Sequence, residues 1–323
     1  MTLTLADLYA SPDHYLHSFD GDAAVFVPMD RAAYHRSIFL DARISPAGEG
    51  ALRLPVSALT QAVPTPATTG WIMHVAHCGS TLLARALDDI DGNLVLREPQ
   101  ALRQLAFAAA DVRLGVTTAM LSKRYRPDLP TIVKGNVPTN FLLPRMIAAD
   151  PGARMILLHL PLRDYLLAIL RSENHRGWLR NVTTQLAVHI WPLADASDAE
   201  RAAALWLAQM RLFADTAATS GTARSLDAEL FFAEPHAVLT AVAGHLGASL
   251  TQDEIEARVR GPLFATYSKN PTVSFDNDQR LARREGLERD LAPELDEAER
   301  WIAERQDHVT AATAAVAAIA LSV

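Results

Sequence analysis

The feature that most constrains the fold is an alternation, from residue 71 onward, of short apolar runs with segments of helical spacing. Apolar runs without a polar face are typical of strands buried on both sides of a parallel sheet. The predicted strands are 71–76, 94–96, 131–133, 155–158 and the weaker 224–226. The predicted helices between and after them are 81–87, 99–110, 141–149, 163–172 and 235–246. This pattern predicts an α/β, three-layer domain around a five-stranded parallel sheet.

Two regions flank this alternation. Residues 1–66 are predicted to form a small N-terminal prelude with short strands at 23–27 and 37–40. A stretch rich in Pro, Thr and Gly separates the prelude from the α/β domain, to which we assign residues 67–323.

Within that domain, a long helix at 197–218 interrupts the alternation and is expected to form a lid or side layer in the helical C-terminal part. The segment 264–284 has little apolar periodicity and several charges, which predicts a long surface loop. Loops of that length in a compact domain are usually functional or disordered, so this one is a candidate to cover a bound nucleotide.

Composition limits the classes of function. The net charge of −7 argues against a nucleic-acid partner, although it allows a local basic pocket for a small anion. The single cysteine, Cys78, fits a reducing compartment. We see no signal-peptide pattern, and the Ala-rich tail at 309–323 is too short to span a bilayer. The sequence therefore predicts a cytoplasmic protein without a membrane partner, and leaves its oligomeric state open.

An anion-binding loop is predicted where the first strand of the alternation meets a helix, at His77-Cys78-Gly79-Ser80-Thr81. A strand–loop–helix turn of this kind directs backbone N–H groups and the positive end of the helix dipole at a phosphate or sulfate. The alternative is a simple Ser/Thr helix cap after a buried strand. The lysine of the nucleotide-kinase motif is replaced by Ser80 and its first glycine by His74, which disfavours hydrolysis of ATP or GTP.

Four stretches, in order along residues 70–250, resemble the PAPS-dependent sulfotransferases. Residues 76–83 resemble the loop that grips the 5′-phosphosulfate of the donor. The others are 96–99, then 133–136 with 151–158, and finally 225–227 with 234–247. The resemblance implies transfer of a sulfuryl group from PAPS to a hydroxyl or amine acceptor, with PAP as the product and without a metal.

Three residues are candidates for the chemistry. Glu98 ends the second predicted strand, and since carboxylate bases occur in branches of the family we expect it to take the acceptor's proton; the alternative is a helix-capping carboxylate. Lys134 follows the third strand, at the sheet edge where ligands gather, and would stabilise the transferred group unless it is merely a solvated lysine. His77 stands where the family has a basic loop residue. A zinc site with His74 and Cys78 is disfavoured because no second Cys/His pair stands at ligand spacing.

The resemblance fails at the donor's 3′-phosphate. The two positions that hold it in the family are Leu160 and Ala168 here. We expect Arg163 to take over first, with Ser172 and Lys269 as helpers, because a guanidinium suits bidentate contact with phosphate. Otherwise the donor differs, or the chain is a non-catalytic protein that binds a nucleotide or a partner. A kinase-like transferase is disfavoured by the missing lysine.

Overall fold

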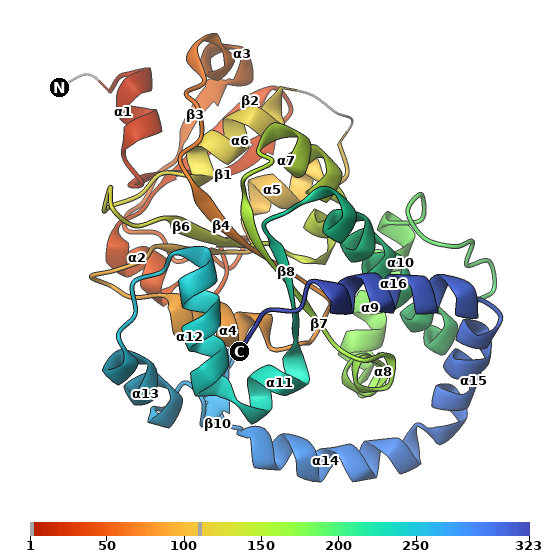
Figure 1. The fold of residues 1–323 in the computed structure, drawn as a ribbon. Coiled ribbons are helices and arrows are strands. Elements are labelled where there is room, and N and C mark those ends of the chain that lie inside the picture. Colours follow the sequence, from red (N-terminus) through yellow and green to blue (C-terminus); the bar gives the residue numbers. More distant parts are fainter. Residues whose placement is uncertain (1–2, 109–111) are drawn as a thin grey trace.

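A computed structural model describes residues 3–108 and 112–323, and its core is a five-stranded parallel sheet (Figure 1). The strand order is β5-β6-β4-β7-β8, and every neighbouring pair is parallel. The strands are β4 (Thr69–His74), β5 (Val95–Arg97), β6 (Thr131–Lys134), β7 (Arg154–His159) and β8 (Ala223–Asp227). The predicted α/β fold with five parallel strands is confirmed, and each strand lies within two residues of its predicted bounds.

Helices cover both faces of this sheet. Gly70 of β4 packs on Leu246 of the helix Pro235–Leu246, whereas the sulfur of Met73, three residues on, lies against Gly135 near the 3₁₀ segment Val137–Leu142. Since side chains an odd number of residues apart on a strand point to opposite faces, these segments cover opposite sides. The helices are α4 (Ser80–Leu87), α5 (Gln100–Leu105), α6 (Arg113–Leu121), α7 (Leu143–Ala149), α8 (Leu162–Leu170), α9 (Glu173–Gln185), α10 (Asp198–Thr219), α11 (Ala228–Ala233), α12 (Pro235–Leu246), α13 (Gln252–Arg260), α14 (Asn277–Asp290), α15 (Ala292–Ala303) and α16 (Gln306–Ala318). The end predicted for α5, at residue 110, lies outside the described residues.

The strand order places a crevice beside β4. The connection from β4 leads toward β5 at one edge of the sheet, whereas the connection from β7 leads toward β8 at the other. Where neighbouring strands send their connections in opposite directions, the loops at their carboxyl ends separate and leave room for a ligand. The carboxyl ends of β4, β5, β6 and β7 are where the sequence places its candidate residues.

The N-terminal region forms the small antiparallel sheet that was expected, with one strand misplaced. The helices here are α1 (Leu5–Ala10), α2 (Arg31–Arg36) and α3 (Val56–Leu59); the strands, in the order β1-β2-β3, are β1 (His14–Asp20), β2 (Ala23–Pro28) and β3 (Leu52–Pro55). The strand predicted at 37–40 is wrong. Carbonyl oxygens of Ser37 and Ile38 accept from the Arg97 guanidinium instead, so they are not available to a neighbouring strand.

The long helix α10 is part of the core, not a lid. Many of its residues are buried, and it contacts α7, α8, α9, α15 and α16. Helix α16 runs along it, and the chain then pairs with the edge strand β8 through Ser225, whose N–H and C=O bond Ile319 and Leu321 at 2.9 and 2.8 Å. Of the two roles that the sequence left open, the lid is wrong and the side layer agrees with the structure, because the Ala-rich faces of α10 pack closely against several helices at once.

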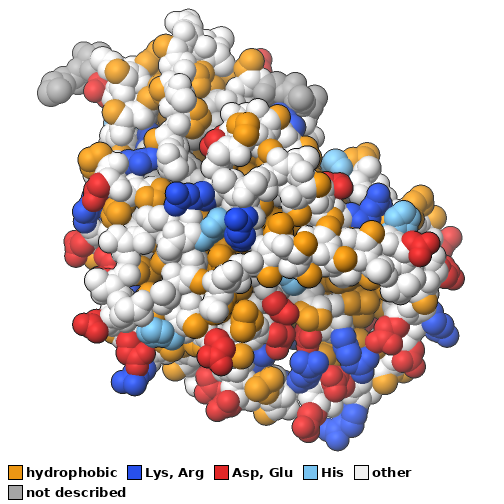
Figure 2. Space-filling model, viewed as in Figure 1, with side chains coloured by type: hydrophobic (Ala, Val, Ile, Leu, Met, Phe, Trp, Pro, Cys, Tyr) orange, Lys and Arg blue, Asp and Glu red, His pale blue; other side chains and the backbone are white. Residues whose placement is uncertain are grey.

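The segment 264–284 contains regular structure in place of the predicted surface loop. It forms a hairpin of β9 (Thr266–Tyr267) and β10 (Asn270–Ser274) and then begins α14. Helix α14 has no buried residue, so the sequence carries no apolar stripe that would predict it. Acidic and basic side chains gather over α14 and α15 along the lower edge of the molecule in Figure 2.

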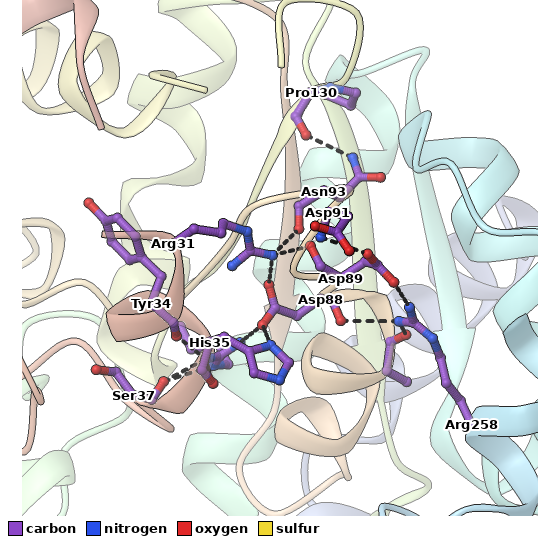
Figure 3. Close-up of polar contacts among 12 residues, drawn as sticks. Arg31, Tyr34, His35, Ser37, Asp88, Asp89, Asp91, Asn93, Pro130 and Arg258 are labelled. Atoms are coloured by element: carbon purple, nitrogen blue, oxygen red, sulfur yellow. Dashed lines mark hydrogen bonds and ion pairs between the residues drawn. The ribbon is translucent and has the colours of Figure 1, made fainter. Parts of the chain in front are cut away.

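A buried ion cluster connects helix α4 to the N-terminal region and to β5 (Figure 3). Asp88, which follows α4, accepts from Arg31 at 2.7 Å and from His35 Nδ1 at 2.8 Å, and lies 3.2 Å from Arg97 Nη1. The Arg97 guanidinium also bonds the carbonyl oxygens of Tyr34 and Ser37, each at 2.6 Å. Only 1% and 2% of the Arg97 and Asp88 side chains is exposed, so removal of Asp88 would leave the buried Arg97 guanidinium without a counter-charge.

The pKa of Asp88 gives this cluster a pH dependence. Burial raises that pKa, but His35, Arg97 and Arg31 outweigh burial and lower it from 3.8 to about 2. A carboxylate whose pKa is lowered by folding stabilises the folded state above its ordinary pKa, and this contribution is lost as the pH falls through the folded value. Here the contribution is present above pH 3.8 and disappears toward pH 2.

We therefore expect acidification to lower the free energy of unfolding of the wild type by roughly 2 kcal/mol more than that of Asp88→Asn. This figure follows from the lowered pKa of Asp88, since one pKa unit corresponds to about 1.4 kcal/mol. At neutral pH, Asp88→Asn should be the less stable protein. Urea unfolding of both proteins at several pH values between 6 and 2 measures the difference. A difference between the two that stays constant over this range would show that Asp88 is not held ionised by folding.

Candidate active site

The predicted anion loop connects β4 to α4 and has two residues in the left-handed region. His77 has φ +60° and Gly79 has φ +79°. Gly79 precedes α4 without any side-chain cap, so the first amides of this helix are left for a ligand. The same glycine allows Phe232 to pack on the loop, because a Cβ at position 79 would lie 2.6 Å from Phe232 Cζ.

A cavity of about 850 Å³ opens over this loop and collects most of the predicted residues. Its volume is within the range of small-molecule sites. The predicted residues on its wall come from the loop, from the ends of β5 and β6, from the start of α9 and from the β9–β10 hairpin. They are His77, Gly79, Ser80, Thr81, Glu98, Lys134, Ser172 and Lys269. Cys78 and Arg163 are not on the wall.

Two buried polar atoms at the loop have no hydrogen-bond partner among the described residues. They are Thr81 Oγ1 and His77 Nε2. A buried polar atom without a partner is costly, so a ligand that bonds it would recover that cost. The hydroxyl and the ring nitrogen therefore support the anion-site interpretation over the simple helix cap.

Glu98 and Lys134 form an ion pair at the ends of β5 and β6. The Glu98 N–H donates to the Lys134 carbonyl at 2.7 Å, and the Lys134 ammonium donates to Glu98 Oε1. Lys134 is almost fully buried, and Arg43 Nη2 lies 3.9 Å from the other oxygen of Glu98. Glu98 itself has φ +55°, a strained conformation for a side chain of this size that is often found at functional sites.

The charges around Glu98 keep it ionised. Burial raises its pKa, but the charge and hydrogen bond of Lys134, with a smaller contribution from Lys269, lower it by more, so the result lies below the ordinary value for glutamate. Burial lowers the pKa of Lys134, and the carboxylate of Glu98 opposes that effect. The pair thus places a carboxylate and an ammonium side by side at the cavity wall, and the carboxylate is not a capping group for α5.

His74 lies beneath this pair and is neutral. Burial first, and then Lys134, lower its pKa to about 3. Its Nδ1 and Nε2 lie 2.8 and 2.9 Å from the carbonyl oxygens of Val75 and Gly135, and a neutral ring donates to only one of them. We find no group of three His, Cys, Asp or Glu residues arranged to hold a metal within residues 3–108 and 112–323.

His77 does not supply the positive charge expected of it. Burial lowers its pKa well below the ordinary value, and Lys269, His175 and Arg171 act in the same direction. Its ring stacks on that of His175 with centroids 3.9 Å apart and meets Trp178 edge-on at 5.8 Å. The sequence could not show this, because His175 and Lys269 lie about 100 and 190 residues further along the chain.

Cys78 contributes only its backbone to the loop. Its thiol is fully buried, with Sγ 4.0 Å from the Leu158 carbonyl oxygen, and burial raises its pKa to about 11. A thiol of this kind is unreactive at neutral pH.

Arg163 points away from the cavity. Its Nη1 bonds Glu299 at 2.8 Å and its Nε lies 3.7 Å from Glu288, so the guanidinium belongs to a surface ion pair with α14 and α15. Leu160 and Ala168 do face the cavity, as do Arg171 and Ser172 where α8 passes into α9. Arg171, and not Arg163, therefore shares the cavity wall with Leu160 and Ala168.

The cations on the cavity wall differ in what neutralises them. Arg280 of α14 bonds both oxygens of Glu229 at 2.7 and 2.9 Å and lies over the Phe232 ring at 4.4 Å. Arg284, one turn on, pairs with Asp164 at 2.7 Å. Arg171 and Lys269 have no hydrogen bond or ion pair with any described residue. Arg283 of α14 also lines the cavity without an ion pair to any described residue and lies over the Phe275 ring at 4.9 Å. These three are the positive groups left for an anionic ligand. Nothing in the sequence pattern around Phe232 indicated its position on the loop.

Comparisons with known proteins give matches to solved structures but none to a family model or a curated sequence. No protein-family model matches the chain, and no curated protein matches it in sequence. Among solved structures it matches the crystal structure of a sulfotransferase from Alicyclobacillus acidocaldarius, with 17% sequence identity and a TM-score of 0.34, over 73% of this chain and 96% of that chain. A match with so low a TM-score says nothing about the chemistry of the cavity, which depends on the residues described above.

No helix of the described residues is long and apolar enough to cross a membrane.

The neutral state of His77 is directly testable. Because the pKa of His77 is well below its ordinary value, its ring should keep one chemical shift between pH 8 and pH 5. NMR of ¹³C-labelled histidine measures this, and His77→Asn assigns the resonance, since asparagine tolerates the left-handed backbone found there. A titration near pH 6.5 would instead show that His77 carries the charge of the loop.

Proposed function

We propose that this protein is a transferase that moves a sulfuryl group from PAPS to a hydroxyl or amine acceptor, with PAP as the other product. One observation carries the proposal. A single cavity joins an uncapped helix N-terminus, two buried polar atoms without partners, an ion-paired carboxylate and three cations without counter-ions among the described residues, Arg171, Lys269 and Arg283. That set suits a doubly anionic donor beside a base, and sulfuryl transfer needs both.

The loop would hold the 5′ end of the donor. The amides at the start of α4, with Ser80 and Thr81 hydroxyls, donate to its oxygens, and His77 contributes a neutral ring nitrogen. Arg171 would hold the 3′-phosphate, with the Ser172 hydroxyl beside it. PAPS supplies an activated sulfuryl group whose leaving group is the phosphate of PAP.

Glu98 and Lys134 would divide the proton and charge transfers. Glu98 accepts the proton of the acceptor's hydroxyl or amine, while Lys134 donates to the oxygen on which negative charge develops. These roles are linked through the ion pair. As Lys134 turns from Glu98 toward the developing charge, the carboxylate loses the partner that holds its pKa down. Glu98 therefore becomes a stronger base as the reaction proceeds.

The first test concerns Glu98. Glu98→Gln should retain PAP affinity and reduce turnover roughly 10²–10⁴-fold, the range for loss of a general base. Calorimetry with PAP and a transfer assay against a panel of phenols, sugars and amines measure the two quantities. Glu49→Gln, an exposed glutamate outside the cavity, is the control and should keep full turnover. Near-normal turnover in Glu98→Gln would exclude Glu98 as the base.

A second test concerns the 3′-phosphate. Wild type should prefer PAP over AMP, and Arg171→Ala should lose that preference by about 1.5–3 kcal/mol, the scale of a charged hydrogen bond. Arg163→Ala is the matched control, because Arg163 lies at the start of α8, the helix that Arg171 ends, and is bound to Glu299, so this variant should keep the preference. Loss of preference in Arg163→Ala alone would place the phosphate at the position that the sequence suggested. Equal wild-type affinity for PAP and AMP would exclude PAPS as the donor.

A further inference from the structure

The anion loop has no positive side chain of its own. His77 occupies the position where a cation was expected and is neutral, and the Cys78 thiol points into the protein core. Backbone amides alone can bind a phosphate, but the charge that develops on a transferred group calls for a cation close by. The missing cation has to come from another part of the chain.

The turn of the β9–β10 hairpin is fixed to the helix that follows the loop. Arg85, on α4, donates from Nη1 to the Ser268 carbonyl at 2.9 Å. Lys269 is the next residue of this turn and lies on the same cavity wall as His77, Gly79 and Ser80. The bond from Arg85 thus ties the hairpin turn to the same helix whose N-terminus forms the anion site.

The charge of Lys269 acts on the catalytic end of the cavity. It lowers the pKa of His77, of Glu98 and of Lys134, which lie at the carboxyl ends of β4, β5 and β6. Burial lowers the pKa of Lys269 itself, and Glu98 opposes that effect. No described carboxylate forms an ion pair with it.

The choice of lysine at this position is also informative. The chain has 27 arginines and only three lysines, Lys123, Lys134 and Lys269, and two of these three face the cavity. Lysine carries a compact charge on a flexible stem and offers no planar fork for a carboxylate. In a chain that otherwise uses arginine for its ion pairs, a lysine on a hairpin turn suits contact with a single small anionic group.

We propose that Lys269 supplies, from the hairpin, the positive charge that the anion loop lacks, and that it contacts the 5′ end of the donor instead of the 3′-phosphate. This inference rests on the proposed function for the identity of the donor. It differs from the sequence prediction, in which Lys269 assisted at the 3′-phosphate. The hairpin would then complete the anion site, and the hydrogen bond from Arg85 would hold the hairpin turn in place against helix α4.

Ligands that carry one phosphate each test which end Lys269 contacts. Lys269→Ala should lower the affinity for PAP and for AMP about 10–100-fold, and should leave the affinity for adenosine 3′-phosphate within twofold of wild type. Arg171→Ala, the matched control, should show the opposite pattern. Calorimetry measures all three ligands. A loss in Lys269→Ala that is confined to the ligands with a 3′-phosphate would overturn the inference.

A labelling experiment on the unmodified protein gives a readout without any variant. Lys123 and Lys134 are only 6% and 1% exposed, so Lys269 should be the lysine that limiting acetic anhydride modifies first. Saturating AMP should slow its acetylation at least fivefold by peptide mass spectrometry. AMP that binds by calorimetry and leaves the acetylation rate unchanged would refute the contact.

Pyrophosphate separates this inference from the proposed function. If no adenosine nucleotide binds the wild type, the PAPS assignment fails, yet pyrophosphate should still protect Lys269 because the loop and the lysine form an anion site. If pyrophosphate also gives no protection, the loop and Lys269 do not act together and the inference is wrong.

Discussion

The ion pair of Asp88 and Arg97 is the constraint on which the geometry of the site depends. Glu98 follows β5 and the anion loop follows β4, but β6 lies between these strands, so backbone hydrogen bonds connect base and loop only indirectly, through β6. Asp88 ends the helix that begins at the loop, and Arg97 directly precedes Glu98. Their buried contact therefore connects the anion loop to Glu98, and neither of the two residues lies on the cavity wall.

Burial on both faces explains why the sequence predicted the central sheet well, and a long-range contact of Arg97 explains why it predicted the N-terminal region less well. Strands β4 and β6 are buried at every residue, and a strand buried on both faces has to be a continuous apolar run, which the sequence displays. The segment 37–40 is also apolar, but it does not form a strand. The guanidinium of Arg97, 60 residues further along the chain, binds the carbonyl oxygen of Ser37, and no local sequence pattern indicates that contact.

For the candidate site, too, the sequence predicted some features and not others. Glu98, Lys134 and the loop could be placed together because parallel strands bring their carboxyl ends to one edge. Their charge states could not be predicted, since these depend on neighbours distant in sequence. His77 is neutral because it is buried beside Lys269, His175 and Arg171, and Arg163 is held outward by Glu299, 136 residues further on. α14 was missed because charges, not apolar contacts, hold it in place.

These charges also determine how the site can select a ligand. Arg280 and Arg284 of α14 are paired with carboxylates of α11 and α8, so they hold the wall together without attracting an anion strongly. The overall charge of −7 repels an anionic donor at a distance, and salt screens that repulsion over about 10 Å. Selectivity must then arise at contact range, where Arg171, Lys269 and Arg283 are the cavity cations without counter-ions among the described residues. A ligand with negative charge at both ends compensates more of these cations than a singly charged one, which leaves charge on the cavity wall uncompensated.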